Sequence, residues 1–196
     1  MMYLVFDFET TGIQGLDRDI PQRAIQLAWL LMDDNNNIVT VKSFYFSGQT
    51  ELNTEFHNTL SIDFLNKVGY TAMEILTLFM KDVQVAVAHN GKLVAHNIEF
   101  DYKILRNELK RTFDSDFELE DHFLYCTMKK STEYCKLPKA KQSNIHKKQS
   151  VGYKYPKLIE LYRVLFNQDP PEKLHDALND VMVTQRCFAA MKTLNL

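Results

Sequence analysis

The sequence predicts an α/β fold, because strand-like segments come first and helical segments then alternate with strands. Short apolar runs near the N-terminus suit strands that are buried on both faces. Later in the chain, apolar residues recur at spacings of three and four, which is typical of helices that pack through one face. Together these patterns indicate a central sheet flanked by helices.

Three strands are expected to open the fold. Residues 3–8 are apolar on both faces, which favours a central strand. Residues 25–32 and 38–46 form two further apolar runs, and the polar cluster at 33–37 between them has the composition of a turn. We therefore expect the second and third strands to form a hairpin.

The rest of the chain alternates predicted helices with two short strands. Apolar residues after Gly69 follow helical spacing as far as Ala86, and Gly91 suits the end of that helix. Pro156 suits the first turn of another helix. In chain order, we expect helices over residues 54–67 and 72–86, a strand over 92–95, a helix over 98–111, a strand over 123–127, a helix from Pro156 and a last helix over 177–193.

Two acidic residues, Asp7 and Glu9, stand at the end of the first predicted strand. Side chains alternate between the two faces of a strand, so both carboxylates point to the same side. Neighbouring carboxylates repel each other, and such a pair persists where a hard cation such as Mg2+ binds it. The pair indicates a metal site for phosphate chemistry, whereas the simpler interpretation is a pair of solvated turn residues.

Two later segments supply further acids and a histidine. Residues 94–101 place Asp101 just inside a predicted helix. Residues 175–180 open the last helix, with His175 five residues before Asp180. Three acidic segments and one histidine are therefore expected to converge.

These three segments resemble the motifs of the DEDDh (DnaQ-like) exonucleases, relatives of the epsilon proofreading subunit of bacterial replicative polymerase. The first motif matches residues 7–12, the second matches 95–101 and the third matches 175–180. A sister branch carries tyrosine four residues before its last aspartate, where this chain has Asp176, so the histidine branch is favoured. All five functional positions of the family are occupied, by Asp7, Glu9, Asp101, His175 and Asp180.

The resemblance implies a ribonuclease H-like mixed five-stranded sheet and a nuclease that uses two Mg2+ or Mn2+ ions. Asp7 would bridge both ions, while Glu9 and Asp180 would hold the ion that carries the attacking water. Asp101 would support the second ion, near the leaving group. His175 would accept the proton of the water, since imidazole titrates near neutral pH.

The resemblance further implies that the segment after the first two acids grips the 3′ end of the substrate. This segment comprises Thr10, Thr11, Gly12 and Ile13. A threonine-glycine turn is also a common way for a chain to leave a strand.

Three polar neighbours of the motif residues have simpler explanations than catalysis. Asp176 stands where a helix N-cap is expected, and Glu99 suits the positive start of its own helix. His96 is expected to be packed or hydrogen-bonded near the second motif, because a site for a hard cation has little use for imidazole. We leave all three out of the predicted site.

Charge is distributed very unevenly along the chain. The 196 residues carry a net charge of −2, but residues 128–157 hold nine lysines against Glu133, which gives +8 and leaves −10 elsewhere. We expect a lysine-rich inserted loop at about 128–157 within a single exonuclease domain spanning 1–196. Lys147 and Lys148 are expected to contact phosphates while interleaved tyrosines stack on bases. The alternative is a solvated loop without a ligand.

Other classes of protein are disfavoured by the composition. No run of eighteen apolar residues appears, and the first residues lack a basic leader, so we expect a soluble, intracellular protein without a membrane partner. The three cysteines are odd in number and lack paired spacing, which argues against a disulfide framework and a zinc knuckle.

The leading hypothesis is a 3′-to-5′ exonuclease that acts on single-stranded DNA ends. An RNA exonuclease with the same site is the alternative, because selectivity depends on contacts to the 2′-hydroxyl that the sequence does not locate. A noncatalytic nucleic-acid-binding module is the third hypothesis, and decay of the five positions would have favoured it. A proofreading role would need a separate polymerase partner.

Overall fold

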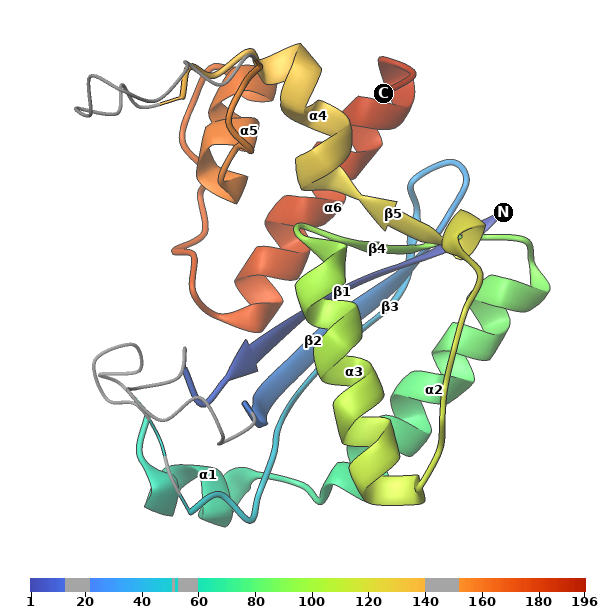
Figure 1. Ribbon diagram of the computed structural model, residues 1–196, viewed down its shortest axis with the longest axis vertical. Helices are drawn as coiled ribbons and strands as arrows, with labels where there is room; N and C mark the ends of the chain where they lie inside the picture. Colours follow the sequence, from blue (N-terminus) through green and yellow to red (C-terminus); the bar gives the residue numbers. More distant parts are fainter. Residues whose placement is uncertain (13–21, 51, 53–59, 140–151) are drawn as a thin grey trace, which may run out of the picture.

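A mixed five-stranded sheet forms the centre of the molecule (Figure 1). The computed structural model describes residues 1–12, 22–50, 52, 60–139 and 152–196. The strands lie in the order β3-β2-β1-β4-β5. Their bounds are Met2–Thr10 for β1, Ala24–Asp33 for β2, Ile38–Tyr45 for β3, Leu93–Ala95 for β4 and Leu124–Cys126 for β5.

The first three strands form the antiparallel part of the sheet. β1 pairs with β2, and β2 pairs with β3 through the predicted hairpin. Asp33 stabilises the turn, because its Oδ1 accepts hydrogen bonds from the backbone N–H groups of Asn35 and Asn37. β1 is longer than predicted and continues to Thr10, since pairing with β2 persists past the two acids with one register shift. Asp7 and Glu9 therefore lie within the strand.

The two short strands complete the sheet in parallel with β1. β4 pairs with β1, and β5 pairs with β4. Gly91 precedes β4 where the chain passes the backbone of Met2. A Cβ atom at Gly91 would lie 1.4 Å from the Met2 carbonyl oxygen, so only glycine fits this approach.

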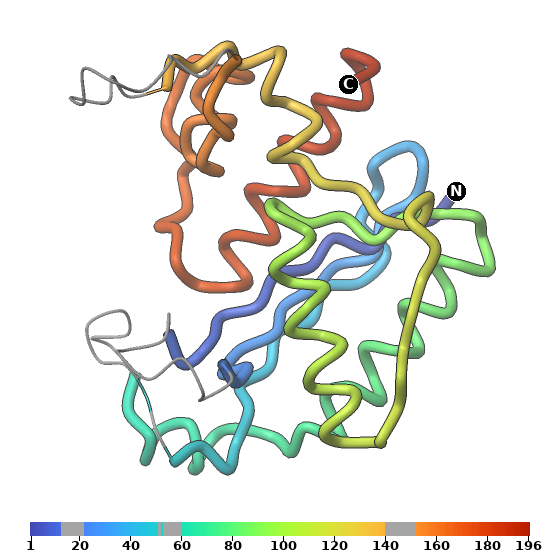
Figure 2. Tube along the Cα trace, viewed as in Figure 1, coloured from blue at the N-terminus to red at the C-terminus, as the bar shows by residue number. Residues whose placement is uncertain are grey.

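Helices cover both faces of the sheet, giving three layers (Figures 1 and 2). Helices α2 and α3 pack on one face, against Leu4, Phe6 and Phe8 of β1. Helix α6 packs on the other face, against Tyr3 and Val5. The helix bounds are Ile62–Val68 for α1, Ala72–Ala88 for α2, Ile98–Phe113 for α3, Thr127–Cys135 for α4, Leu158–Phe166 for α5 and Ala177–Thr193 for α6.

The predicted helices agree with the structure apart from their ends. Helix α2 starts with a capping box between Thr71 and Glu74, and α6 spans the range expected for the last helix. Helix α5 buries Leu158, Leu161 and Tyr162, three of the residues on the predicted face. Of the helix predicted over 54–67, residues 54–59 lie outside the described residues, and α1 begins after Ser61.

The prediction of a loop over residues 128–157 is wrong for residues 128–135, which belong to helix α4. The buried face of α4 consists of Thr127, Ser131, Thr132 and Cys135 rather than large apolar residues. The hydroxyl groups of Ser131 and Thr132 can be buried because both donate hydrogen bonds to the Met128 carbonyl oxygen. Residues 140–151 lie outside the described residues.

The predicted α/β class and the ribonuclease H-like mixed sheet are confirmed. All three cysteines are free and buried. In the part of the chain that the structure describes, no helix combines the length and the apolar character needed to cross a membrane.

Candidate metal and nuclease site

Asp7 and Glu9 project from β1 toward helix α6. Tyr3 and Val5 precede them on the same face of the strand and pack against α6 residues, so the alternation along β1 carries both carboxylates to that side. Both acids are partly buried. The same-face prediction is therefore confirmed by the packing of their neighbours.

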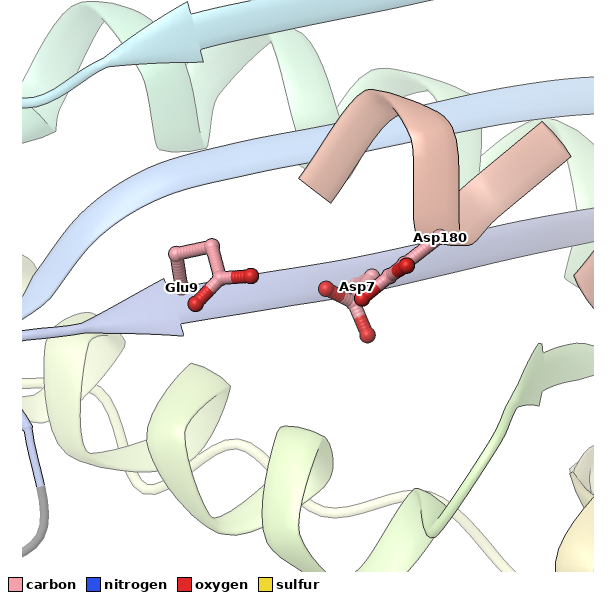
Figure 3. A group of neighbouring side chains, drawn as sticks. All are labelled: Asp7, Glu9 and Asp180. Atoms are coloured by element: carbon pink, nitrogen blue, oxygen red, sulfur yellow. The ribbon is translucent and has the colours of Figure 1, made fainter. Parts of the chain in front are cut away.

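Asp180 meets these two acids from α6 (Figure 3). It lies in the first turn of the helix. One carboxylate oxygen from each of Asp7, Glu9 and Asp180 lies within 4.8 Å of the other two. The Asp180 Oδ2 atom accepts a hydrogen bond from the backbone N–H of His175 at 3.4 Å. The Asp180 Oδ1 atom is buried and has no hydrogen-bond partner in the described part of the chain.

Asp101 lies in the first turn of helix α3, which packs on the other face of the sheet from α6. Its exposed fraction is 2%, and its Oδ1 accepts a hydrogen bond from the backbone N–H of Phe8 at 3.0 Å. The carboxylate of Asp101 is close enough to help raise the pKa of Asp7. Asp101 is not part of the group whose oxygens lie within 4.8 Å, so the structure brings together three predicted acids and places the fourth beside them.

Burial and mutual repulsion make the charged form of this cluster unfavourable. Burial, with the charges of Asp101 and Asp180, raises the pKa of Asp7 well above its usual 3.8. Burial and the charges of Asp180 and Asp176 raise the pKa of Glu9 to about 7. Burial raises the pKa of Asp101 to about 8 and that of Asp180 to about 6.

The donor set of this cluster fits a hard divalent cation. All ligand atoms available from Asp7, Glu9 and Asp180 are carboxylate oxygens, which Mg2+ and Mn2+ prefer. The unpaired, buried Oδ1 atom of Asp180 lacks a partner that a cation would supply. Positive charge would also relieve the repulsion that raises the carboxylate pKa values.

His175 lies at the edge of the cluster. Its side chain is exposed, and its backbone adopts φ +71°, a conformation uncommon outside glycine. Asp176, the next residue, caps α6 by accepting hydrogen bonds from the backbone N–H groups of Leu178 and Asn179, as predicted. The Asp176 cap and the hydrogen bond from His175 N–H to Asp180 hold His175 next to the acids.

The segment after Glu9 continues directly from the cluster. Thr11 exchanges two hydrogen bonds with Arg23: its N–H donates to the Arg23 carbonyl at 2.9 Å, and its Oγ1 accepts from the Arg23 N–H at 3.2 Å. Gly12 has φ +108°, which favours glycine. Thr10 is buried at the end of β1. The predicted substrate contacts Ile13, Lys147 and Lys148 lie outside the described residues.

His96 is hydrogen-bonded near the second motif, as predicted, and Glu99 lies in the first turn of its own helix, α3, as predicted. The Nδ1 atom of His96 lies 3.0 Å from the hydroxyl oxygen of Thr127, and its Nε2 atom lies 3.0 Å from the carbonyl oxygen of Pro156. Burial lowers the pKa of His96 to about 4, so the imidazole is neutral. Glu99 forms an exposed ion pair with Lys129 of α4. Neither side chain belongs to the acidic cluster.

The sequence interpretation missed one polar residue near the cluster, Gln26 of β2. It pairs in register with Glu9 and is buried. A single amide within an otherwise apolar strand was the available signal, because a buried amide needs hydrogen-bond partners.

Comparisons with known proteins give structures of similar fold and one matching family model. No curated protein matches the chain by sequence. Exonuclease I from E. coli in complex with a dT13 oligonucleotide superposes with a TM-score of 0.73 at 17% identity, over 98% of this chain and 41% of that chain. The complex with dA16 gives a TM-score of 0.71 at 17% identity, with the same coverage.

A third similar structure is the moderately thermophilic exonuclease I of Methylocaldum szegediense. Its TM-score is 0.70 at 16% identity, over 98% of this chain and 40% of that chain. The chain thus spans about two fifths of the length of these neighbours and shares their fold. The family model described as Exonuclease (RNase_T) matches residues 4–188. Because this match covers most of its length, the chain belongs to the Exonuclease family.

Proposed function

We propose that the chain is a metal-dependent exonuclease that removes nucleotides from the 3′ end of single-stranded DNA, and that residues 1–196 form one exonuclease domain. The observation that carries this proposal is the convergence of Asp7, Glu9 and Asp180 in a member of the Exonuclease family. The dT13 and dA16 oligonucleotides bound by the similar structures support DNA as the substrate.

Asp7, Glu9 and Asp180 would hold two divalent cations, Mg2+ or Mn2+, with Asp101 supporting them from α3. When bound, the cations would supply positive charge to the reacting phosphate and lower the pKa of the attacking water. The protein contributes the position of each carboxylate: β1 fixes Asp7 and Glu9 on one face, and α6 presents Asp180 from its first turn. The bond from Phe8 N–H keeps Asp101 against the strand.

His175 would act as the general base that accepts a proton from the attacking water. Its exposed side chain next to Asp180 is accessible to a nucleic-acid end and to solvent. General-base assistance is typically worth about a hundredfold to ten-thousandfold in rate. Loss of the imidazole should therefore slow hydrolysis and leave binding largely intact.

The segment Thr10, Thr11, Gly12 and Ile13 would bind the terminal nucleotide, and Lys147 and Lys148 would bind phosphates further along the strand. Exposed Tyr134 and Tyr155 are available for stacking on bases. Replacing Lys147 and Lys148 with glutamine should reduce the salt slope of single-strand binding by about 0.7 for each lost contact. Lys110, which pairs with Asp114 at the end of α3, provides the control substitution. An unchanged slope in the double variant would remove these lysines from the interface.

A nuclease assay tests the proposal. Protein is incubated with 5′-labelled single-stranded DNA and matched RNA, with Mg2+, with Mn2+ or with chelator. We expect stepwise shortening of DNA from the 3′ end that needs a cation and that Asp7→Ala abolishes. Asp116→Ala, which changes an exposed acid on the loop after α3, is the matched control and should retain activity.

The same assay separates the competing functions. Faster shortening of the RNA would make the protein an RNA exonuclease with the same site. Tight oligonucleotide binding without turnover in either cation would indicate a binding module. Equal DNA digestion in chelator would refute metal dependence.

A further inference from the structure

Gln26 is a buried amide in the middle of the sheet. Its exposed fraction is 3%, and its neighbours in β2 are apolar. It stands opposite Glu9 in the register between β1 and β2. Burying an amide is unfavourable unless its polar atoms are paired, so the partners of Gln26 indicate what it holds in place.

All three hydrogen-bonding groups of the Gln26 side chain reach partners. Its Oε1 accepts from the backbone N–H of Ala177 at 3.2 Å. Its Nε2 donates to the Oδ2 atom of Asp176 and to the Oγ atom of Ser43, both at 3.2 Å. The backbone N–H can only donate and a carboxylate accepts, so these partners fix the orientation of the amide.

The two α6 partners are the residues at which the helix begins. One oxygen of Asp176 accepts from Gln26 while the other caps the helix by accepting from the N–H groups of Leu178 and Asn179. Asp180 follows one turn later, and its carboxylate bonds to the backbone of His175. Gln26 thus links the start of α6 directly to β2, at the position that pairs with Glu9 of β1.

This connection opposes the repulsion within the acidic cluster. Asp7, Glu9 and Asp180 bring three carboxylates within 4.8 Å, two from β1 and one from α6. Without a tie between sheet and helix, repulsion favours a shift of the α6 start away from β1. Apolar packing of α6 begins at Ala177 and continues at Val181 and Phe188, whereas the cap residue Asp176 is not part of this apolar cluster and is held by hydrogen bonds.

We propose that Gln26 is a positioning residue that holds the first turn of α6, with Asp180 and His175, at the distance from Asp7 and Glu9 that cation binding and hydrolysis require. Gln26 acts through Asp176 and the Ala177 backbone and touches no member of the acidic cluster by a hydrogen bond that the structure describes. The inference rests on the proposed function, and it also predicts properties of the metal-free protein.

Three variants isolate the connection. Gln26→Leu keeps the approximate volume and removes every hydrogen bond. Gln26→Glu keeps an acceptor for the Ala177 N–H but replaces the Nε2 donor with a carboxylate oxygen. That oxygen would face the carboxylate of Asp176 and repel it. Gln26→Glu combined with Asp176→Asn exchanges donor and acceptor, preserves the total charge and retains a helix-capping residue.

Gln49→Leu is the matched control. Gln49 is also buried, with an exposed fraction of 4%, and its Nε2 donates to the carbonyl oxygen of Ala24 at the start of β2. The control therefore loses a buried amide that bonds to the same strand, β2, from the segment after β3, without a hydrogen bond to α6. Urea unfolding of each variant confirms that the proteins compared are folded.

Three measurements are made on each folded variant. Hydrogen exchange of the Ala177 amide in metal-free protein reports the connection itself, and a Mn2+ titration followed by electron paramagnetic resonance reports the cation affinity. Nuclease kinetics with single-stranded DNA add kcat and KM. Replacing a residue that orients metal ligands without binding the metal typically costs about tenfold to a hundredfold in metal affinity or activity.

We expect Gln26→Leu and Gln26→Glu to weaken Mn2+ binding and lower kcat by about tenfold or more, with KM changed less. Ala177 exchange should accelerate in Gln26→Leu, the exchanged pair should recover most of the loss, and Gln49→Leu should resemble the wild type. Wild-type Mn2+ affinity and kcat in Gln26→Leu, or a double variant no better than Gln26→Glu, would overturn the inference. A wild-type protein without nuclease activity would refute the proposed function instead, and Ala177 exchange would still decide the role of Gln26.

Discussion

Replacing Asp180 with asparagine should stabilise the metal-free protein at neutral and higher pH. The Oδ2 atom of Asp180 accepts one hydrogen bond, from His175 N–H, and an asparagine oxygen can accept the same bond. The asparagine Nδ2 group would then occupy the position of the Oδ1 atom, which has no partner among the described residues. A repulsive carboxylate would be replaced by a donor facing the other acids.

The size of this effect follows from the pKa of Asp180. Burial raises that pKa from 3.8 to about 6. An acid whose pKa is higher in the folded state binds more protons when folded, so stability falls as pH rises from about 4 to about 6. The full loss is about 3 kcal/mol, because one pKa unit corresponds to about 1.4 kcal/mol. Solvent at this partly exposed carboxylate screens part of the effect, so we expect the variant to gain about 2 kcal/mol at pH 8.

Urea unfolding in chelator at pH 8 and at pH 4.5 measures this gain. At pH 4.5 the folded wild type is protonated at Asp180, so the gain should fall below about 1 kcal/mol. Asp34→Asn is the control, because Asp34 accepts hydrogen bonds from Tyr3 and Lys192 and its pKa is lowered, chiefly by the Tyr3 bond. This control should not stabilise at pH 8. Destabilisation of Asp180→Asn at pH 8, or an equal gain at both pH values, would refute the cost of keeping the buried Asp180 carboxylate charged.

Three further outcomes are expected. His175→Gln should lower single-turnover hydrolysis by about a hundredfold to ten-thousandfold with oligonucleotide affinity nearly unchanged, and a wild-type rate would exclude the general-base role. Mg2+ or Mn2+ should raise the melting temperature of the wild type but not of Asp7→Asn, as measured by calorimetry with matched chelator controls. Gly91→Ala should destabilise by about 3 kcal/mol, or about 6–12 °C in melting temperature, because its Cβ would collide with the Met2 carbonyl; an unchanged melting temperature would contradict the close approach.

The sequence predicted the sheet and the last helix well because their signals are local. Alternation along β1 placed Asp7 and Glu9 on one face, and the spacing of apolar residues located α5 and α6 closely. Helix α4 was missed because its buried face carries hydroxyl groups, so no apolar stripe marks it. The extension of β1 past its acids depends on pairing with β2, which the isolated segment does not encode.

The acidic cluster was predicted through motif resemblance, and its internal arrangement required the fold. Asp7, Glu9 and Asp180 converge, whereas Asp101 bonds to the backbone of Phe8. The connection from Gln26 to Asp176 joins residues 150 positions apart, so no local pattern predicts it. Such contacts depend on how α6 docks on the sheet.

The rate of 3′-end shortening of single-stranded DNA as a function of Mg2+ concentration, for the wild type and Asp7→Ala, tests metal-dependent hydrolysis at the acidic cluster most directly. We expect a saturable dependence on Mg2+ in the wild type, no activity in chelator and no activity in the variant at any concentration. Shortening that proceeds at the same rate in chelator, or that survives in Asp7→Ala, would contradict this expectation.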